Sequence, residues 1–236
     1  MLVRILVLLT GRQNSSLPRK NMLEINGKPC IYYPIMAARK ALGEKAEYYC
    51  SSDSDEVLQF AQRHNYTSIK RPLELALDTA LHVDVLNHSL DVIDKDIFDA
   101  ILVLLANAPV IHESWIKKSI TLLSNDLSLT SVIPTIIDQD HHPYRAKVLD
   151  DSGLLRSFFP NKASISSNRQ SLPDAHFPAH NFWLIRLQNG KLPDTGDSPW
   201  GFFGDKVAPI QLPVTISDIH TKLDQIKIEL EWSLWN

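Results

Sequence analysis

The chain has 236 residues, of which 44% are apolar and 22% are charged, and it carries 24 basic and 27 acidic side chains. This length suits one domain with its own core, and the formal charge of −3 argues against sequence-independent binding to nucleic acid, which needs a basic surface. Only 8 residues are glycine, about 3% against the usual ~7%, which excludes collagen-like and glycine-repeat architectures and disfavours a phosphate loop built from several glycines.

Two further features bear on location. Cys30 and Cys50 have no metal-ligand spacing around them, which indicates a reducing compartment rather than a disulfide framework. The apolar run over 5–9 precedes a polar loop instead of a small-residue cleavage site, so it predicts a buried first strand rather than a signal peptide. No run approaches the ~18 consecutive apolar residues of a membrane span. We therefore expect a cytoplasmic protein with no membrane and no nucleic-acid partner.

Strand-like and helix-like segments alternate along the first 137 residues. Apolar runs predict strands over 3–9, 46–51, 67–69, 100–105 and 129–137, and helical spacing predicts helices over 31–42, 55–64, 80–93 and 113–123. The alternation predicts an α/β fold, a Rossmann-like three-layer sandwich with a mostly parallel central sheet. Ligands of such sheets bind at the carboxyl ends of the strands, so the candidate site lies in loops 10–21, 51–55, 70–79 and 105–112.

The pattern changes near residue 138. Residues 138–181 hold several prolines and many serine, asparagine and histidine residues, which predicts a loop-rich excursion that acts as a lid or a dimer arm. A strand over 182–187 and a helix over 216–234 are expected to follow. We expect a single domain over residues 1–236.

The loop after the first strand is the first candidate for binding chemistry. From Gly11 to Asn21 it contains three cations and two hydroxyls, namely Arg12, Arg19, Lys20, Ser15 and Ser16. Cations and backbone N–H groups at such a position suit a polyphosphate. From the spacing alone, a solvated basic loop is an equally good interpretation.

A series of motifs, in order, resembles those of the CMP-sugar-acid synthetases, the cytidylyltransferases for sialic, pseudaminic and legionaminic acids and KDO. They are residues 17–21 (LPRKN), 27–29 (GKP), 51–56 (SSDSDE), 71–80 (RPLELALDTA), 104–109 (LLANAP), 142–145 (HPYR), 169–175 (RQSLPDA) and 218–224 (DIHTKLD). Each motif is weak alone, and their number and order carry the resemblance over nearly the whole chain.

The resemblance implies a nucleotide-diphospho-sugar transferase type of fold, a homodimer, and transfer of CMP from CTP to the anomeric hydroxyl of a sugar acid. It implies Mg²⁺ as cofactor, with Mn²⁺ as an alternative, and catalytic roles for Arg12, Lys20 and Asp218. It implies substrate binding by Ser15, Ser16, Asn21, Arg71, Asp78, Asn107, Arg145, Arg169 and Gln170, and metal binding by Asp218 and His220.

This chain departs from the family pattern at four places. The phosphate loop lacks a glycine pair, Ala106 replaces a glutamine, and Pro178-Ala179-His180 replaces Pro-Asn-Gly. His220 stands where a second carboxylate is usual, which should weaken a Mg²⁺ site. These changes favour a nonulosonic or ulosonic acid other than an ordinary sialic acid.

Two other hypotheses stay open. The chain would be a degenerate family member that binds a nucleotide or a partner, or a neighbouring nucleotide-sugar enzyme, such as a glycosyltransferase whose metal motif is Asp53-Ser54-Asp55. Structural roles compete with the site roles as well: Asp78, Asp53 and Asp55 as helix caps, Arg145 as a surface cation, and His220 as a polar residue at a helix start. The pair His141-His142 lacks a spaced third ligand for zinc.

Overall fold

The computed structural model describes residues 3–13, 17–94, 97–159, 165–216 and 218–232. Its centre is an eight-stranded sheet with the strand order β10-β7-β11-β6-β1-β4-β5, and β12 also pairs with β7. The strands are β1 (Ile5–Thr10), β4 (Ala46–Ser52), β5 (Thr67–Lys70), β6 (Ala100–Leu105), β7 (Ser131–Ile137), β10 (His176–Pro178), β11 (Phe182–Arg186) and β12 (Val207–Gln211). Two separate small hairpins pair β2 (Glu24–Ile25) with β3 (Lys28–Pro29) and β8 (Lys147–Leu149) with β9 (Leu155–Ser157).

Most of the sheet is parallel. β1 pairs in parallel with β4 and β6, β4 with β5, and β12 with β7. β11 lies antiparallel between β6 and β7, and β10 is antiparallel to β7. The carboxyl ends of β1, β4 and β6 therefore meet at one edge, as the sequence predicts.

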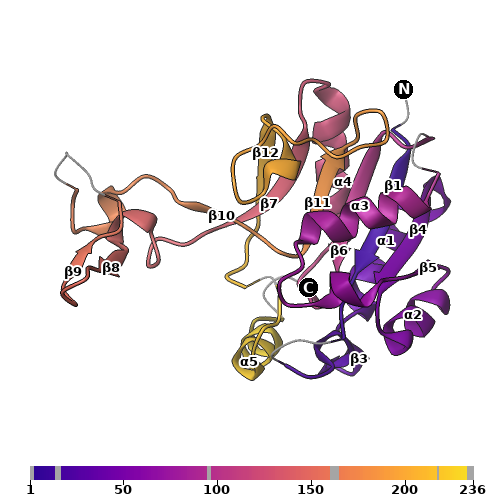
Figure 1. The fold of residues 1–236 in the computed structure, drawn as a ribbon, viewed down its shortest axis with the longest axis horizontal. Coiled ribbons are helices and arrows are strands. Elements are labelled where there is room, and N and C mark those ends of the chain that lie inside the picture. The colour runs from indigo at the N-terminus through magenta and orange to yellow at the C-terminus, as the bar shows by residue number, and fades with distance from the viewer. Residues whose placement is uncertain (1–2, 14–16, 95–96, 160–164, 217, 233–236) are drawn as a thin grey trace.

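Helices cover both faces of the sheet (Figure 1). They are α1 (Tyr32–Leu42), α2 (Asp55–Gln62), α3 (His82–Val92) and α4 (Glu113–Asn125), whereas α5 (Lys222–Glu231) packs through Ile228 with Ile25 of β2 in a separate small cluster. Val7 and Leu9 of β1 belong to the core cluster that α1, α2 and α4 complete, whereas Leu6 and Leu8 belong to the cluster of α3. Alternate residues of a strand point to opposite faces, so the apolar run of β1 is buried on both sides. The α/β three-layer prediction is confirmed.

β10 and β11 both pair with β7, and the segment between them is irregular at the edge of the sheet where the parallel strands have their carboxyl ends. Pro178 pairs with Thr135 and Leu184 pairs with Val132. Six residues from β10 to β11 therefore span the same distance as three residues of β7. The three extra residues lie within segment 179–183 between these two pairs. The side chain of Asn181 donates to Val110 O at 3.0 Å, and this bond holds the bulge against the edge of the sheet.

Residues 138–175, here called the arm, leave the sheet from β7 and return to it through β10. Figure 1 shows the arm as a projection away from the sheet, with the β8–β9 hairpin at its far end. Every residue of β8 and β9 is exposed. The predicted excursion is therefore an extended arm in this structure.

Besides five short strands that the sequence does not predict, namely β2, β3, β8, β9 and β10, the structure differs from the predictions in two further elements. β12 is missed because Pro209 interrupts its pattern, although proline is tolerated in a strand that pairs on one side only. The last helix begins at Lys222 rather than at 216, because Thr221 and Asp224 form a capping box that fixes its first turn. No described helix is both long and apolar enough to cross a membrane.

Candidate active site

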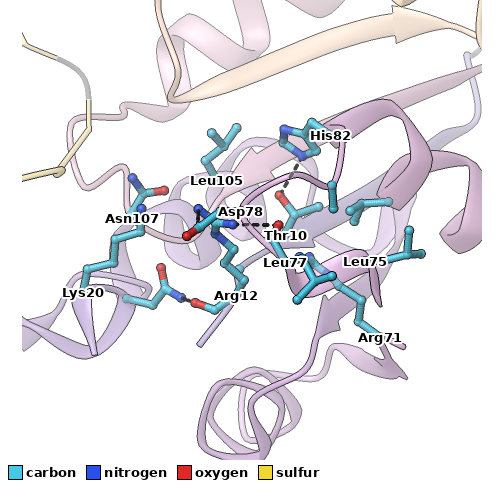
Figure 2. Close-up of a pocket in the computed structure, with 14 residues that line it drawn as sticks. Thr10, Arg12, Lys20, Arg71, Leu75, Leu77, Asp78, His82, Leu105 and Asn107 are labelled. Atoms are coloured by element: carbon cyan, nitrogen blue, oxygen red, sulfur yellow. Dashed lines mark hydrogen bonds and ion pairs between the residues drawn. The ribbon is translucent and has the colours of Figure 1, made fainter. Parts of the chain in front are cut away.

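A cavity of about 220 Å³ opens at the carboxyl ends of β1 and β6 (Figure 2). Its lining includes six of the residues predicted from the sequence, namely Arg12, Lys20, Asn21, Arg71, Asp78 and Asn107. Three of the four predicted loops thus contribute to the wall, and the fourth supports it through Ser51. Ser15 and Ser16, predicted in the same loop, lie outside the described residues.

The loop after β1 is clamped at both ends. Gly11 N–H donates to Ser51 O at 3.2 Å, and the Asn21 side chain, which is 3% exposed, donates to Arg12 O at 3.0 Å. A Cβ atom at Gly11 would lie 2.8 Å from the Cβ of Ala106 and 3.0 Å from Asn21 Nδ2. The single glycine of this loop is therefore required by close packing.

Replacing Gly11 with alanine is expected to lower the free energy of unfolding by about 1–3 kcal/mol, because the added methyl group must displace Ala106 or Asn21. Urea titration of the purified protein measures this loss. Gly201→Ala is the matched control, since the nearest atom to its added Cβ lies 3.5 Å away. Equal losses in the two variants would contradict the clamp.

Arg12 crosses the mouth of the cavity. Its Nη2 lies 2.8 Å from Asp78 Oδ1, and its Nη1 donates to Leu77 O at 2.9 Å. The side chain of Asp78 is otherwise exposed, and the N-cap of α3 is Leu81, without a side-chain cap bond. The interpretation of Asp78 as the cap of this helix is therefore wrong, because its carboxylate binds the guanidinium of Arg12.

Two more cations lie in the wall. Burial lowers the pKa of the half-buried Lys20, and the Asp218 carboxylate nearby opposes that shift. Arg71 is 5% exposed, and it donates from Nη2 to Ser51 O at 2.8 Å and from Nε to Ser51 Oγ at 3.3 Å. Burial lowers the pKa of Arg71 to about 10, so this guanidinium stays charged at neutral pH.

Asp218 lies beside this cavity in a hydrogen-bonded group. Asn107 Nδ2 donates to Asp218 Oδ2 at 3.3 Å and to Ile219 O at 3.0 Å, while His220 Nε2 lies 2.7 Å from Asp218 Oδ2. The bond to Asp218 raises the pKa of His220, which favours an ion pair. His220 also precedes the Thr221 cap of α5, so the interpretation of it as a residue at a helix start is consistent with the structure.

His82 is a cavity residue that the sequence reasoning missed. Its Nε2 lies 3.2 Å from Thr10 Oγ1, and its ring faces Trp183 with a centroid distance of 5.1 Å. Burial lowers the pKa of His82 to about 3, with smaller contributions from the charges of Arg71 and His180. The sequence placed it only in the first turn of a helix, because its partner Thr10 is far away in the chain.

This lowered pKa predicts a pH dependence of stability. Below the ordinary pKa of ~6.5 an unfolded His82 binds a proton, whereas the folded one stays neutral down to about pH 3. The free energy of unfolding should therefore decrease as the pH is lowered through this window, by up to about 1.4 kcal/mol per pH unit from this group. Urea unfolding at pH 7 and pH 4.5 should show a smaller loss for His82→Asn than for the wild type. The same loss in both proteins would contradict the assignment.

The structure does not bring the predicted arm residues to the cavity. Arg169 Nη1 donates to Asp140 Oδ1 at 2.6 Å, and Arg145 Nη1 lies 3.8 Å from the same oxygen. Gln170 is an exposed neighbour of Arg169 in the arm. Within one chain, these residues lie in the arm, which projects away from the sheet (Figure 1).

The acidic segment 53–55 has a different role from a metal motif. Asp53 Oδ1 accepts from Gln13 N–H at 2.9 Å, Asp55 pairs with Lys70 Nζ at 2.6 Å, and the Ser54 hydroxyl caps α2. The described residues contain no group of three or more histidine, cysteine or acidic side chains placed to hold a metal ion. This geometry disfavours the glycosyltransferase hypothesis.

Comparison with known proteins decides the family. A family model for cytidylyltransferases matches residues 6–175, more than half of the chain. The chain belongs to the cytidylyltransferase family. The matched segment includes the cavity residues from Thr10 to Asn107 and the whole arm, and it ends before Asp218 and His220.

Relatives within this family differ in their named substrates. The N-acylneuraminate cytidylyltransferase of Streptococcus agalactiae serotype V is 27% identical over 67% of this chain and 41% of that protein. The pseudaminic acid cytidylyltransferase of Campylobacter jejuni is 28% identical over 71% of this chain and 72% of that protein. The present chain thus spans less than half of the length of the streptococcal relative.

Solved structures show that this cytidylyltransferase shares its fold with two further synthetases. The CMP:2-keto-3-deoxy-manno-octonic acid synthetase in complex with CTP has a TM-score of 0.68 at 18% identity. The 4-diphosphocytidyl-2C-methyl-D-erythritol synthase of Anaerococcus prevotii has a TM-score of 0.63 at 14% identity. Both cover 98% of this chain and 99% of the other.

Proposed function

We propose that this cytidylyltransferase couples CTP to a nonulosonic or ulosonic sugar acid and releases pyrophosphate. The observation that carries the proposal is the convergence of Arg12, Lys20 and Arg71 on one cavity at the carboxyl ends of β1 and β6. Three cations in one wall suit a nucleoside triphosphate, and the family supplies the nucleotide class. We also propose a cytoplasmic location and a single working domain over residues 1–236.

The chemistry needs positioning and charge neutralisation rather than a protein nucleophile. The anomeric hydroxyl oxygen of the sugar acid forms a bond to the α-phosphorus of CTP and releases its proton to solvent, while the bond from the α-phosphorus to the α,β-bridging oxygen breaks and pyrophosphate leaves with that oxygen. Lys20 and Arg12 bind the phosphates, and Arg12 exchanges Asp78 for a phosphate oxygen as it does so. Asn107 orients Asp218 at the side of the cavity.

The donor set fits a bound Mg²⁺ through one carboxylate. Asp218 would hold the ion, since Mg²⁺ commonly uses one or two carboxylates together with substrate phosphates and waters. His220 does not fit as a second ligand in this geometry, because its Nε2 is taken up by Asp218 Oδ2. A bound Mg²⁺ would neutralise charge on the phosphates, and Mn²⁺ is an alternative because carboxylate and phosphate oxygens suit it as well.

The test is pyrophosphate release from CTP with a panel of nonulosonic acids and KDO, with Mg²⁺ or Mn²⁺ present. We expect turnover with at least one acid and a weaker signal with UTP. The absence of pyrophosphate with every acid and both metals, although CTP binds, would contradict catalysis.

A second candidate function is nucleotide binding without turnover. The ion pair between His220 and Asp218 favours it, because this pair removes the carboxylate that would bind a metal. The variant His220→Asp separates the two functions. A large rise in Mg²⁺-dependent turnover would support the enzyme, whereas tight CTP binding without turnover in both proteins would support the binding function.

We further propose that a second copy of the chain covers the arm, which gives a homodimer. The described part of the arm exposes seven large hydrophobic side chains, namely Tyr144, Val148, Leu149, Leu154, Leu155, Phe158 and Phe159. Such a patch marks an interaction surface. Light scattering should give a dimer for the wild type and a monomer for Leu149→Glu with Leu155→Glu. In the dimer, Arg145, Arg169 and Gln170 would be available to the sugar acid in the partner's cavity.

A further inference from the structure

Residues 73–80, here called the strap, form one wall of the cavity. Four of them line it, and Figure 2 shows Leu77 and Asp78 next to Arg12. The chain is fixed just before the strap, because Arg71 N–H donates to the carbonyl of the last residue of β4 at 2.9 Å. It is fixed again just after the strap, where α3 begins. The strap therefore crosses the side of the cavity between two anchored points.

The strap has few contacts that hold it in place. Ala76 is its one buried residue, and none of its residues belongs to the three core clusters of the described chain. Among the hydrogen bonds and ion pairs of the described residues, those that join the strap to another loop all come from Arg12, at 2.9 Å to Leu77 O and 2.8 Å to Asp78 Oδ1. Segments with little buried apolar surface open most readily. Arg12 is therefore the tether of the strap.

This tether can be exchanged by moving one side chain. The backbone at Arg12 is held in place, because the buried Asn21 side chain donates to Arg12 O at 3.0 Å. The ion pair itself is accessible, since the side chains of Arg12 and Asp78 are 31% and 85% exposed, and ion pairs this exposed are weak. A guanidinium binds phosphate oxygens in the same way as carboxylate oxygens. A triphosphate, with several such oxygens and more charge, can therefore displace Asp78 from Arg12.

We propose that Arg12 is a latch with two positions. Without a ligand it ties the strap to the phosphate loop through Leu77 O and Asp78, and a bound triphosphate takes its guanidinium and releases the strap. Asp78 is then an internal competitor that lowers the affinity for triphosphates, whereas the resemblance implies that it binds the substrate. This assignment rests on the proposed function, since it takes Arg12 to bind phosphates.

A spin label on the strap of the full chain tests the release. Thr79→Cys places the label at an exposed position, and the two native cysteines are buried and do not react. Inorganic tripolyphosphate is the probe, because it has no base or ribose that could hold the strap itself. Paramagnetic resonance should show a restricted label that becomes more mobile with tripolyphosphate, or without it in Arg12→Gln. Asp84→Asn, an exposed acidic residue on α3 outside the cavity, is the control that should leave the mobility unchanged.

Calorimetry with the same probe tests the competition. Asp78→Asn should bind tripolyphosphate about three- to fivefold more tightly than the wild type, which is the range for an exposed ion pair. The Kd of Asp84→Asn should not change. An unchanged Kd in Asp78→Asn overturns the latch, and so does tighter binding with an unmoved label, which would make Asp78 a repelling charge only. A wild type that binds neither tripolyphosphate nor CTP overturns the proposed function as well, whereas binding that leaves the label restricted overturns the latch alone.

Discussion

Replacement of Lys20 by alanine is expected to lower kcat/KM for CTP by about 100- to 1,000-fold, the usual effect of losing one positioned charge at a reacting phosphate or oxyanion. Arg12 is already engaged by Asp78 and Leu77, whereas none of the described residues accepts a hydrogen bond from Lys20 Nζ. Burial lowers the pKa of Lys20, which shows that its ammonium group is poorly hydrated. A poorly hydrated cation gains most when a phosphate oxygen reaches it.

Pyrophosphate release with the accepted sugar acid measures the loss, and calorimetry with CTP alone separates binding from turnover. Lys40→Ala is the matched control, since Lys40 is an exposed lysine on α1 far from the cavity wall. A kcat/KM of Lys20→Ala within about tenfold of the wild type would place the triphosphate elsewhere.

Replacement of Trp183 by alanine is expected to lower the free energy of unfolding by about 3–5 kcal/mol. Trp183 on β11 is 1% exposed, and its indole N–H donates to Ala179 O at 3.1 Å across the bulge. Its ring contacts Phe203 at 5.3 Å and His82 at 5.1 Å between centroids. The truncation therefore leaves a cavity and an unpaired carbonyl at once.

A graded series tests the two contributions by urea unfolding at a fixed protein concentration. Trp183→Phe should cost less, about 1–3 kcal/mol, because most of the ring remains and only the bond to Ala179 O is lost. Leu127→Ala is the control, since Leu127 is 79% exposed and should change stability by less than about 0.5 kcal/mol. Similar losses for Trp183→Ala and Leu127→Ala would contradict the packing described for β11.

The sequence predicts those parts of the fold that depend on local pattern. The run over 100–105 coincides with β6, because a strand buried on both faces must be apolar throughout. The strand at 207–211 is not predicted, because Pro209 lowers its strand signal and only the pairing with β7 stabilises it. The local periodicity of a sequence does not show which distant segments pair with each other.

The candidate site, too, could be predicted only where it depends on local sequence motifs. The loop motifs place Arg12, Lys20 and Arg71 near one another, because loops at the carboxyl ends of parallel strands meet. His82 could not be selected, since its contact with Thr10 joins α3 to β1, which are far apart in the chain. The bond between Asp78 and Arg12 likewise joins two loops, and a lone carboxylate before a helix resembles a cap in the sequence.

The arm has a consequence for how this protein can vary. Ile137 and His176 are partners in the pairing of β7 with β10, so the chain leaves and re-enters the sheet at a single rung. The length and surface of everything beyond that rung can change without altering the register of β7 against β11 or the geometry of the cavity. The arm, through which we propose that the protein binds a second copy of itself, can thus vary independently of the cavity that we propose to bind the nucleotide.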